Sequence, residues 1–185
     1  EKFRDEFVGR VQALRVGDPK VETTQVGAVV SSAHMEKILG YIELGKEEGG
    51  TLLCGGVRIH LPNEHADGYF IQPTVFEGLA FDCRMNQEEI FGPVVTLTPF
   101  DDVEEVIQMA NSTPYGLSAT LWTNDLNKAT RVSKALEAGI VWVNTWLNRD
   151  LRTPFGGMKN SGMGREGGWD ALGFFTEKKN VCIKL

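Results

Sequence analysis

Two adjacent acidic residues give the chain its first chemical signal. Glu88 and Glu89 begin the string EEIFGP (residues 88–93), in which two carboxylates precede an aromatic residue and a glycine–proline turn. A carboxylate beside a turn at the mouth of a sheet can accept hydrogen bonds from two vicinal hydroxyls. The alternative is an ordinary turn whose acids are solvated. Taken alone, the string marks a candidate binding segment and leaves its ligand open.

A glycine pattern near the end of the chain resembles a second ligand site, but the sequence around it does not support that function. Gly162, Gly164 and Gly167 match the G-x-G-x-x-G spacing of dinucleotide-binding turns. That fingerprint must follow a strand and open a long helix, whereas here a glycine-rich stretch precedes it. We therefore expect a loop that needs positive φ and close backbone approach, not a phosphate cradle.

Other reactive side chains lack the neighbours that catalysis requires. Cys54, Cys83 and Cys182 are odd in number and far apart, which is typical of reduced thiols in a cytoplasmic protein. The acids and histidines of residues 60–67 lie in a polar loop without the helical spacing of a metal motif. We expect no metal site and no catalytic residue among these side chains.

Length and composition limit the protein class. The chain has 185 residues, of which 42% are hydrophobic and 24% charged, with a net charge of −6. This predicts a folded chain with one ordinary domain, or one domain and a small appendage. The acidic balance argues against nucleic acid as a partner. No apolar run is long enough to span a bilayer, so we expect no membrane partner.

The first half of the chain predicts helices and short strands. Apolar residues at helical spacing indicate a helix over residues 3–14. A second helix is expected after Ser31 or Ser32, either of which can cap it. Residues 51–54 are typical of a strand, and residues 69–75 of an extended segment. Pro73 argues against a central position for that segment.

The second half alternates strands with helices. Strands are predicted at residues 94–98, 117–123 and 140–143, and helices at 103–110 and 126–136. Asp102 is a candidate cap for the first helix. This order predicts right-handed crossovers, a largely parallel sheet and the α/β class.

The end of the chain has a different pattern. Val181, Ile183 and Leu185 alternate with polar or smaller residues, which indicates a single strand. A strand at the end of a chain must pair with an oligomeric partner or with an edge of its own sheet.

Several further strings agree with the EEIFGP segment. They are PYGL (114–117), VWVN (141–144), PFGGMK (154–159) and SGMGRE (161–166). In the order, spacing and residue identity of these motifs, the chain resembles the C-terminal part of the aldehyde dehydrogenase superfamily. The resemblance implies a partial catalytic domain over residues 1–168 and a tail with an oligomerisation strand over residues 169–185. It also implies that the cofactor-binding domain is absent from this chain.

The same resemblance implies the chemistry. In the family a cysteine attacks an aldehyde, a hydride passes to NAD or NADP, and a glutamate base helps water to release the acid. Those catalytic residues match positions outside this chain, so we expect the chain alone to be inactive. Glu89 matches the acid that holds the hydroxyls of the nicotinamide ribose, and Phe91 the aromatic residue beside it. Residues 179–185 match the strand that pairs with a neighbouring subunit of a homo-oligomer.

The loop over residues 145–153 resembles that of 2-hydroxymuconic and 2-aminomuconic semialdehyde dehydrogenases. Their substrates arise from aromatic ring cleavage and carry a carboxylate remote from the aldehyde, and a guanidinium can grip a carboxylate with two hydrogen bonds. By this resemblance Arg149 is the carboxylate anchor and Phe155 an apolar wall, while Arg152 pairs with Asp150. The alternatives are a surface salt bridge for Arg149 and ordinary core packing for Phe155. At Asn148 the residue type departs from the one usual at this loop position in the relatives.

Two other functions remain open from the sequence. The chain could belong to an aldehyde dehydrogenase of another substrate class, such as betaine aldehyde or retinal. It could also be a non-catalytic structural or interaction protein that keeps the fold without the chemistry.

Overall fold

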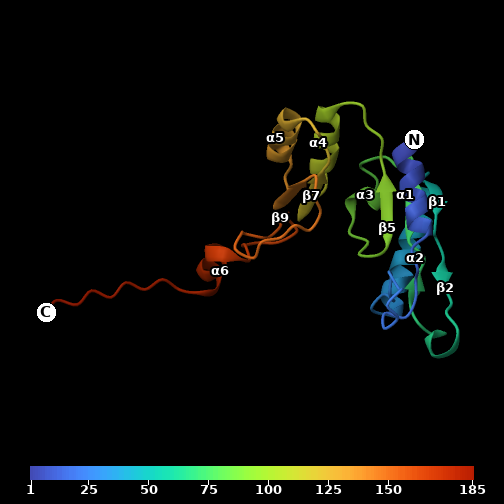
Figure 1. Ribbon diagram of the computed structural model, residues 1–185, viewed down its shortest axis with the longest axis horizontal. Coiled ribbons are helices and arrows are strands. Elements are labelled where there is room, and N and C mark those ends of the chain that lie inside the picture. Colours follow the sequence, from blue (N-terminus) through green and yellow to red (C-terminus); the bar gives the residue numbers. More distant parts are fainter. The chain divides into compact units, whose positions relative to one another are not determined.

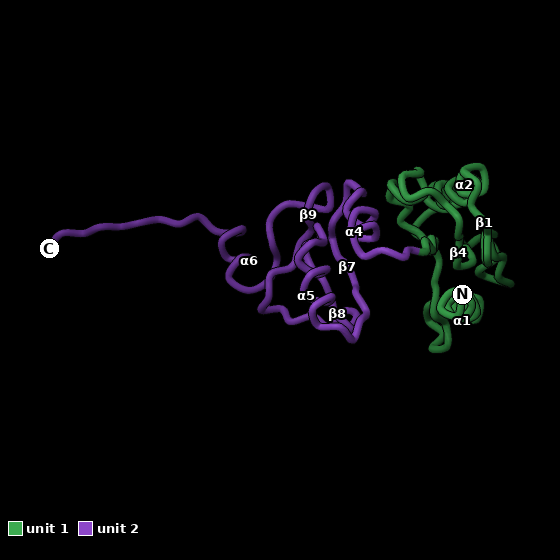
Figure 2. The backbone as a smooth tube through the Cα atoms, turned by 90° about the horizontal axis from the view of Figure 1, so that it is seen from above, with its two compact units in different colours: residues 1–99 green, residues 100–185 purple.

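The computed structural model describes all 185 residues, which form two compact units, Glu1–Pro99 and Phe100–Leu185 (Figure 2). Each unit combines helices with short strands (Figure 1), in agreement with the predicted α/β class. None of the helices combines the length and the apolar character that crossing a bilayer requires.

The first unit is built on a three-stranded sheet. The sheet has the order β1-β4-β5, in which β1 pairs with β4 antiparallel and β4 with β5 parallel. A separate antiparallel pair joins β2 and β3. The elements are α1 (Lys2–Gln12), α2 (Ser32–Glu47), β1 (Thr51–Cys54), β2 (Arg58–Ile59), a short 3-10 turn η1 (Asn63–His65), β3 (Phe70–Ile71), β4 (Thr74–Glu77), α3 (Arg84–Gln87) and β5 (Val94–Leu97).

The core of this unit lies between α2 and the sheet. The side chain of Ser31 accepts a hydrogen bond from the backbone N–H of His34 and so caps α2, as predicted. Ile38 and Ile42 on the apolar face of α2 are fully buried, together with Phe76 of β4. Burial of such side chains is the main favourable contribution to folding, so α2 is fixed firmly on the sheet.

The expectation that Pro73 argues against a central position for residues 69–75 is wrong for the part that forms β4. β4 is the central strand of the sheet, and it begins at Thr74, one residue after the proline. Pro73 therefore lies outside the ladder, where its missing N–H costs no pairing. The first hydrogen bond of β4 comes from the backbone N–H of Thr74, which donates to the carbonyl oxygen of Pro93 at 2.8 Å.

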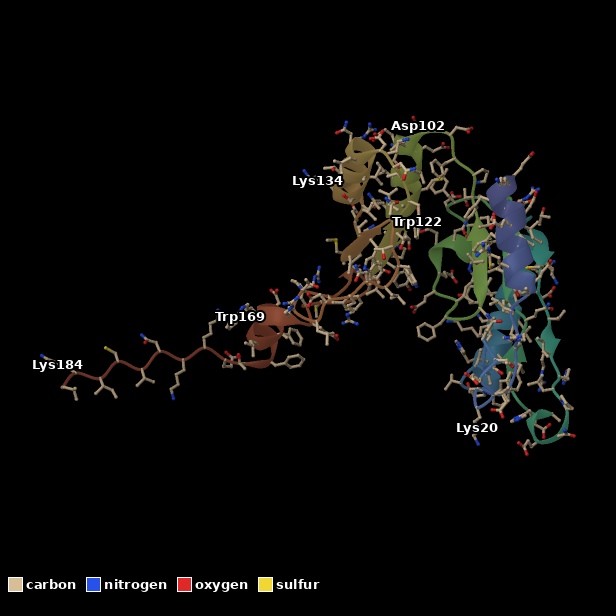
Figure 3. All side chains as sticks on the ribbon, in the orientation of Figure 1. Lys20, Asp102, Trp122, Lys134, Trp169 and Lys184 are labelled. Carbon is tan, nitrogen blue, oxygen red and sulfur yellow. The ribbon has the colours of Figure 1, made fainter.

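The second unit contains a parallel strand–helix–strand unit. β7 and β8 pair in parallel from Ser118↔Ile140 to Leu121↔Val143, with α5 as the connection between them. Asp102 caps α4, and Figure 3 shows it at the start of that helix. The elements are α4 (Val103–Asn111), β6 (Tyr115–Gly116), β7 (Ser118–Leu121), α5 (Leu126–Ala135), β8 (Ile140–Val143), β9 (Met158–Lys159) and α6 (Gly168–Phe175).

Each unit contains one of the predicted parallel strand ladders. β5 pairs with β4 in the first unit, whereas β7 and β8 form a pair of their own. Both ladders are parallel, as predicted, but antiparallel pairs (β1–β4, β2–β3 and β6–β9) accompany them. The alternation of strands and helices identified the class, while the choice of neighbour depends on contacts distant in sequence.

The tail after α6 is extended and forms no strand pair within the second unit. Residues 176–185 contain no helix or strand, and Figure 3 shows their side chains, Lys184 among them, pointing alternately to opposite sides. Val181, Ile183 and Leu185 are exposed. Within its own unit the predicted strand therefore has no partner.

Candidate functional site

The segment of residues 88–92 is attached to α2 through its backbone. Lys37 Nζ donates to the carbonyl oxygen of Glu89 at 2.8 Å. One turn earlier on α2, His34 Nε2 donates to the carbonyl oxygen of Phe91 at 2.7 Å. Since α2 is fixed by the core, these two bonds fix the path of the segment. We call residues 88–92 the helix-bound segment.

The side chain of Glu88 adds a third attachment. Its carboxylate accepts two hydrogen bonds from Arg84, at 2.7 and 3.0 Å, and one from the hydroxyl of Tyr41 at 2.5 Å. The bonds from Arg84 and then from Tyr41 lower the pKa of Glu88 from its ordinary value of 4.5 to about 2. The same contacts raise the pKa of Arg84 and of Tyr41. Glu88 is therefore ionised at neutral pH and joins α2 to α3.

Gly92 allows the segment to lie directly against the core. A Cβ at this position would lie 2.6 Å from Cδ1 and 2.7 Å from Cγ1 of Ile38, which is fully buried. Contacts this short are not tolerated in a packed interior. The glycine of the EEIFGP string is thus explained by close approach to α2.

The two predicted cofactor residues have exposed side chains. The Glu89 carboxylate makes no hydrogen bond or ion pair within the chain and is exposed. Phe91 is 74% exposed and adopts φ 59°, a conformation uncommon for a non-glycine residue. Residues held in such conformations cluster at binding sites. The Phe91 ring contacts the His34 ring edge-on, with 6.1 Å between the ring centres. An unpaired carboxylate near an exposed aromatic ring, both on a fixed backbone, fits the requirements for holding a ribose and a nicotinamide ring.

The second predicted site lies in the loop that follows β8. Asn144 adopts φ 55° and makes two hydrogen bonds with the backbone of Thr123, at 2.8 Å to its N–H and 2.7 Å to its carbonyl oxygen. Further along the loop, the carbonyl oxygen of Asn148 accepts a hydrogen bond from Nε1 of Trp142 at 2.9 Å. These contacts tie the start of the loop to the β7–β8 pair. We call residues 144–153 the self-bound loop.

The predicted pairing of Arg152 with Asp150 is confirmed. The guanidinium donates from Nε and from a terminal nitrogen to both oxygens of Asp150, at distances of 2.5 to 3.1 Å. The pair lowers the pKa of Asp150 and raises that of Arg152. The hydroxyl of Thr153 donates to the carbonyl oxygen of Asp150 at 2.7 Å and closes the turn.

Arg149 and Phe155, the two predicted substrate residues, are in contact. The guanidinium carbon of Arg149 lies 3.9 Å from the centre of the Phe155 ring, a cation–π arrangement. The only ion pair of Arg149 is with Glu166 at 3.7 Å, and its side chain is 39% exposed. Phe155 is half-buried and borders a cleft of about 250 Å³ that Glu166 and the glycine-rich stretch 156–164 also line. The arrangement leaves guanidinium donors available to an incoming anion.

The predicted behaviour of the glycine-rich stretch is confirmed. Gly162, Gly164 and Gly167 have φ values of 145°, 75° and 82°, which glycine adopts without strain. Phe155 and Glu166 enclose most of this stretch through reciprocal backbone hydrogen bonds of 2.7 Å.

Sequence reasoning missed the residues that support the two sites. His34, Lys37 and Tyr41 lie at positions i, i+3 and i+7 of α2, so a polar stripe beside the apolar one could have drawn attention to them. Glu166 as the partner of Arg149 has no local signal, since 17 positions separate the two residues.

Comparison with known proteins agrees with this arrangement. The aldehyde dehydrogenase family matches residues 1–181. The 2-aminomuconic 6-semialdehyde dehydrogenase of a Pseudomonas species is 48% identical over 100% of this chain, and the 2-hydroxymuconic semialdehyde dehydrogenase of Pseudomonas sp. strain CF600 is 49% identical over 98%. A solved structure of an aldehyde dehydrogenase from Bacillus cereus in complex with NAD⁺ is 42% identical, with a TM-score of 0.89, and the match covers 95% of this chain and 35% of that one.

The chain belongs to the aldehyde dehydrogenase family. It spans about 38% of the length of the two Pseudomonas relatives.

Proposed function

We propose that the chain is part of an NAD(P)⁺-dependent enzyme that oxidises an aldehyde to a carboxylic acid. Residues 1–168 are part of its catalytic domain, and residues 169–185 are a tail whose last strand pairs with a neighbouring subunit of a homo-oligomer. Family membership over residues 1–181 supports the reaction class. The exposed alternation of Val181, Ile183 and Leu185 supports the pairing of the tail.

The proposed cofactor residues are Glu89 and Phe91. The free Glu89 carboxylate would accept hydrogen bonds from the two ribose hydroxyls, and the exposed Phe91 ring would pack beside the ribose and the nicotinamide. When bound, the nicotinamide would accept the hydride from the aldehyde. The NAD⁺ complex of the Bacillus cereus relative supports a nicotinamide cofactor. The task of this chain is to hold that ring in place during transfer.

The proposed substrate is an aldehyde that carries a carboxylate, such as 2-hydroxymuconic or 2-aminomuconic semialdehyde. The observation that carries this proposal is the guanidinium of Arg149, which lies over the Phe155 ring at 3.9 Å and has only a loose contact with Glu166. Stacking orients the planar donors, so they are prepared for a bidentate bond with a carboxylate. Phe155 would provide the apolar wall along the substrate. The names of the two Pseudomonas relatives support the same substrate class.

Kinetics of the full-length protein test this assignment. Arg149→Ala should lower kcat/KM for a carboxylated semialdehyde by about 30- to 1,000-fold, because a lost charge-assisted contact costs about 2 to 4 kcal/mol. The same change should leave an uncharged aldehyde of similar length almost unaffected. Arg152→Ala is the matched control, since Arg152 already pairs with Asp150.

Two results would contradict the substrate assignment. Equal losses on both aldehydes would mean that Arg149 supports the fold. Unchanged kinetics together with a preference for a cationic aldehyde would favour the betaine aldehyde class instead.

A further inference from the structure

The two adjacent glutamates of the helix-bound segment have opposite environments. The Glu88 carboxylate accepts three hydrogen bonds, whereas the Glu89 carboxylate has no partner in the chain. A turn with two solvated acids would show no such division. The difference indicates that Glu88 serves the structure on which Glu89 is displayed.

The partners of Glu88 come from two different elements. Arg84 is the first residue of α3, and Tyr41 lies on α2, 47 positions before Glu88. A carboxylate bound bidentately by a guanidinium is held in distance and orientation, and the Tyr41 bond prevents rotation of that pair relative to α2. The start of the helix-bound segment is therefore fixed relative to the core.

A second Arg–Glu pair in the same unit lacks this property. Arg10 and Glu6 lie four residues apart on α1, as Arg84 and Glu88 do, and their ion pair measures 2.8 Å. Both residues belong to one helix and no third side chain joins them. Such an exposed pair adds little stability and positions nothing else. What distinguishes Glu88 is its bridge to α2, one residue before the free carboxylate.

We propose that Glu88 is a positioning residue for cofactor binding: held by Arg84 and Tyr41, it sets where the Glu89 carboxylate and the Phe91 ring meet the nicotinamide ribose. This inference rests on the proposed function of Glu89 and Phe91. Binding groups must be held close to their productive geometry by neighbours that are themselves fixed. Removal of Glu88 leaves the backbone bonds from Lys37 and His34 and frees the first residue of the segment.

Measurements of NAD⁺ binding to the full-length protein test the inference. Glu88→Ala should raise the Kd for NAD⁺, followed by quenching of protein fluorescence, by about 10-fold or more, since small misplacements of binding groups can cost up to about 100-fold. The KM for NAD⁺ should rise with it, while the KM for the aldehyde should change little. Glu88→Gln should recover most of the affinity, because an amide oxygen still accepts bonds from Arg84 and Tyr41. Glu6→Ala is the matched control and should bind NAD⁺ normally.

The outcomes separate this inference from the function on which it rests. An unchanged Kd for NAD⁺ in Glu88→Ala, with only a lower melting temperature, overturns the positioning role. If Glu88→Ala does not fold, Tyr41→Phe decides: a raised Kd supports the role and an unchanged Kd overturns it. The proposed cofactor site itself fails if Glu89→Ala and Phe91→Ala both bind NAD⁺ normally. When those two variants bind weakly and the Glu88 variants do not, only the positioning role is wrong.

Discussion

The helix-bound segment and the self-bound loop carry the two proposed binding sites, and they are held in contrasting ways. The helix-bound segment has partners on α2, 47 to 57 positions away in sequence. The self-bound loop is held by Thr123, 21 positions away, by Trp142 and the backbone of Gly168, and by bonds among its own residues. The first depends on the core of its unit, whereas the second depends on β7, β8 and its own turn.

This contrast fits the demands on the two proposed ligands. A cofactor is the same in every turnover, so the residues that hold it can be built into the packing of a helix on a sheet. A substrate differs between relatives, so its recognition is better placed on a loop whose changes leave the core intact. Four changes test whether the two regions differ in this way.

The largest effect should come from Gly92→Ala. The added Cβ would meet the buried side chain of Ile38, and overpacking of this kind costs about 1 to 3 kcal/mol. Urea unfolding of the full-length protein should show the loss, and hydrogen exchange should become faster over residues 88–94. Gly40→Ala on α2 is the control, because a Cβ there meets nothing within 4 Å, and it should be as stable as the wild type or more so. Equal stability of both variants would contradict the close packing.

Asn144→Ala should have a smaller effect, confined to the self-bound loop. It removes two hydrogen bonds to Thr123 and places alanine at φ 55°, for which we expect a loss of about 1 to 2 kcal/mol. Hydrogen exchange should become faster over residues 121–148 and remain unchanged over the helix-bound segment. Asn148→Ala is the control within the same loop, with an expected change within about 0.5 kcal/mol. Faster exchange in the helix-bound segment would show that the two regions are coupled.

Arg152→Ala should change global stability by less than about 1 kcal/mol. The side chains of Arg152 and Asp150 are 89% and 44% exposed, and exposed ion pairs of this kind are weak and screened by salt. Urea unfolding at low and high salt measures the change. A loss well above 1 kcal/mol that persists at high salt would mean that this turn, and not Asn144, holds the loop.

The smallest effect on stability at neutral pH should come from the fourth change, Glu88→Gln, which removes a titrating carboxylate. Because its folded-state pKa lies below the ordinary value, its ionised form stabilises the fold above about pH 4.5, and this contribution is lost as the pH falls through about 2. Acid unfolding should therefore show wild type losing its advantage over Glu88→Gln between those values. Glu89→Gln, which removes a carboxylate without a partner in the chain, is the control. A constant advantage across that range would contradict the strong pairing of Glu88.

Features that depend on neighbouring residues could be predicted from the sequence. The cap of α2 at Ser31 and the strands at residues 51–54 and 140–143 follow from side-chain patterns within a few positions. The pair of Asp150 and Arg152 was accessible for the same reason, since two positions separate its members.

Features that depend on distant contacts could not be predicted in this way. The pairing of the strand at 94–97 with β4 could not be read from the local pattern of either strand. Sheet neighbours are chosen by packing of whole elements, which periodicity does not encode. For the candidate site, Glu89 and Phe91 were identified by resemblance. The attachment of their backbone to Lys37 and His34 required the structure.

The manner in which the self-bound loop closes has a practical consequence for protein engineering. Asn144 locks its entrance to Thr123, and just beyond its exit Phe155 is locked to Glu166 through their backbones. Residues 145–153 therefore behave as a cassette with fixed ends. A designer who wishes to redirect this scaffold toward a new aldehyde can graft that stretch from a relative, provided that the contacts of Trp146 and of the Asn148 carbonyl with the buried Trp142 are kept.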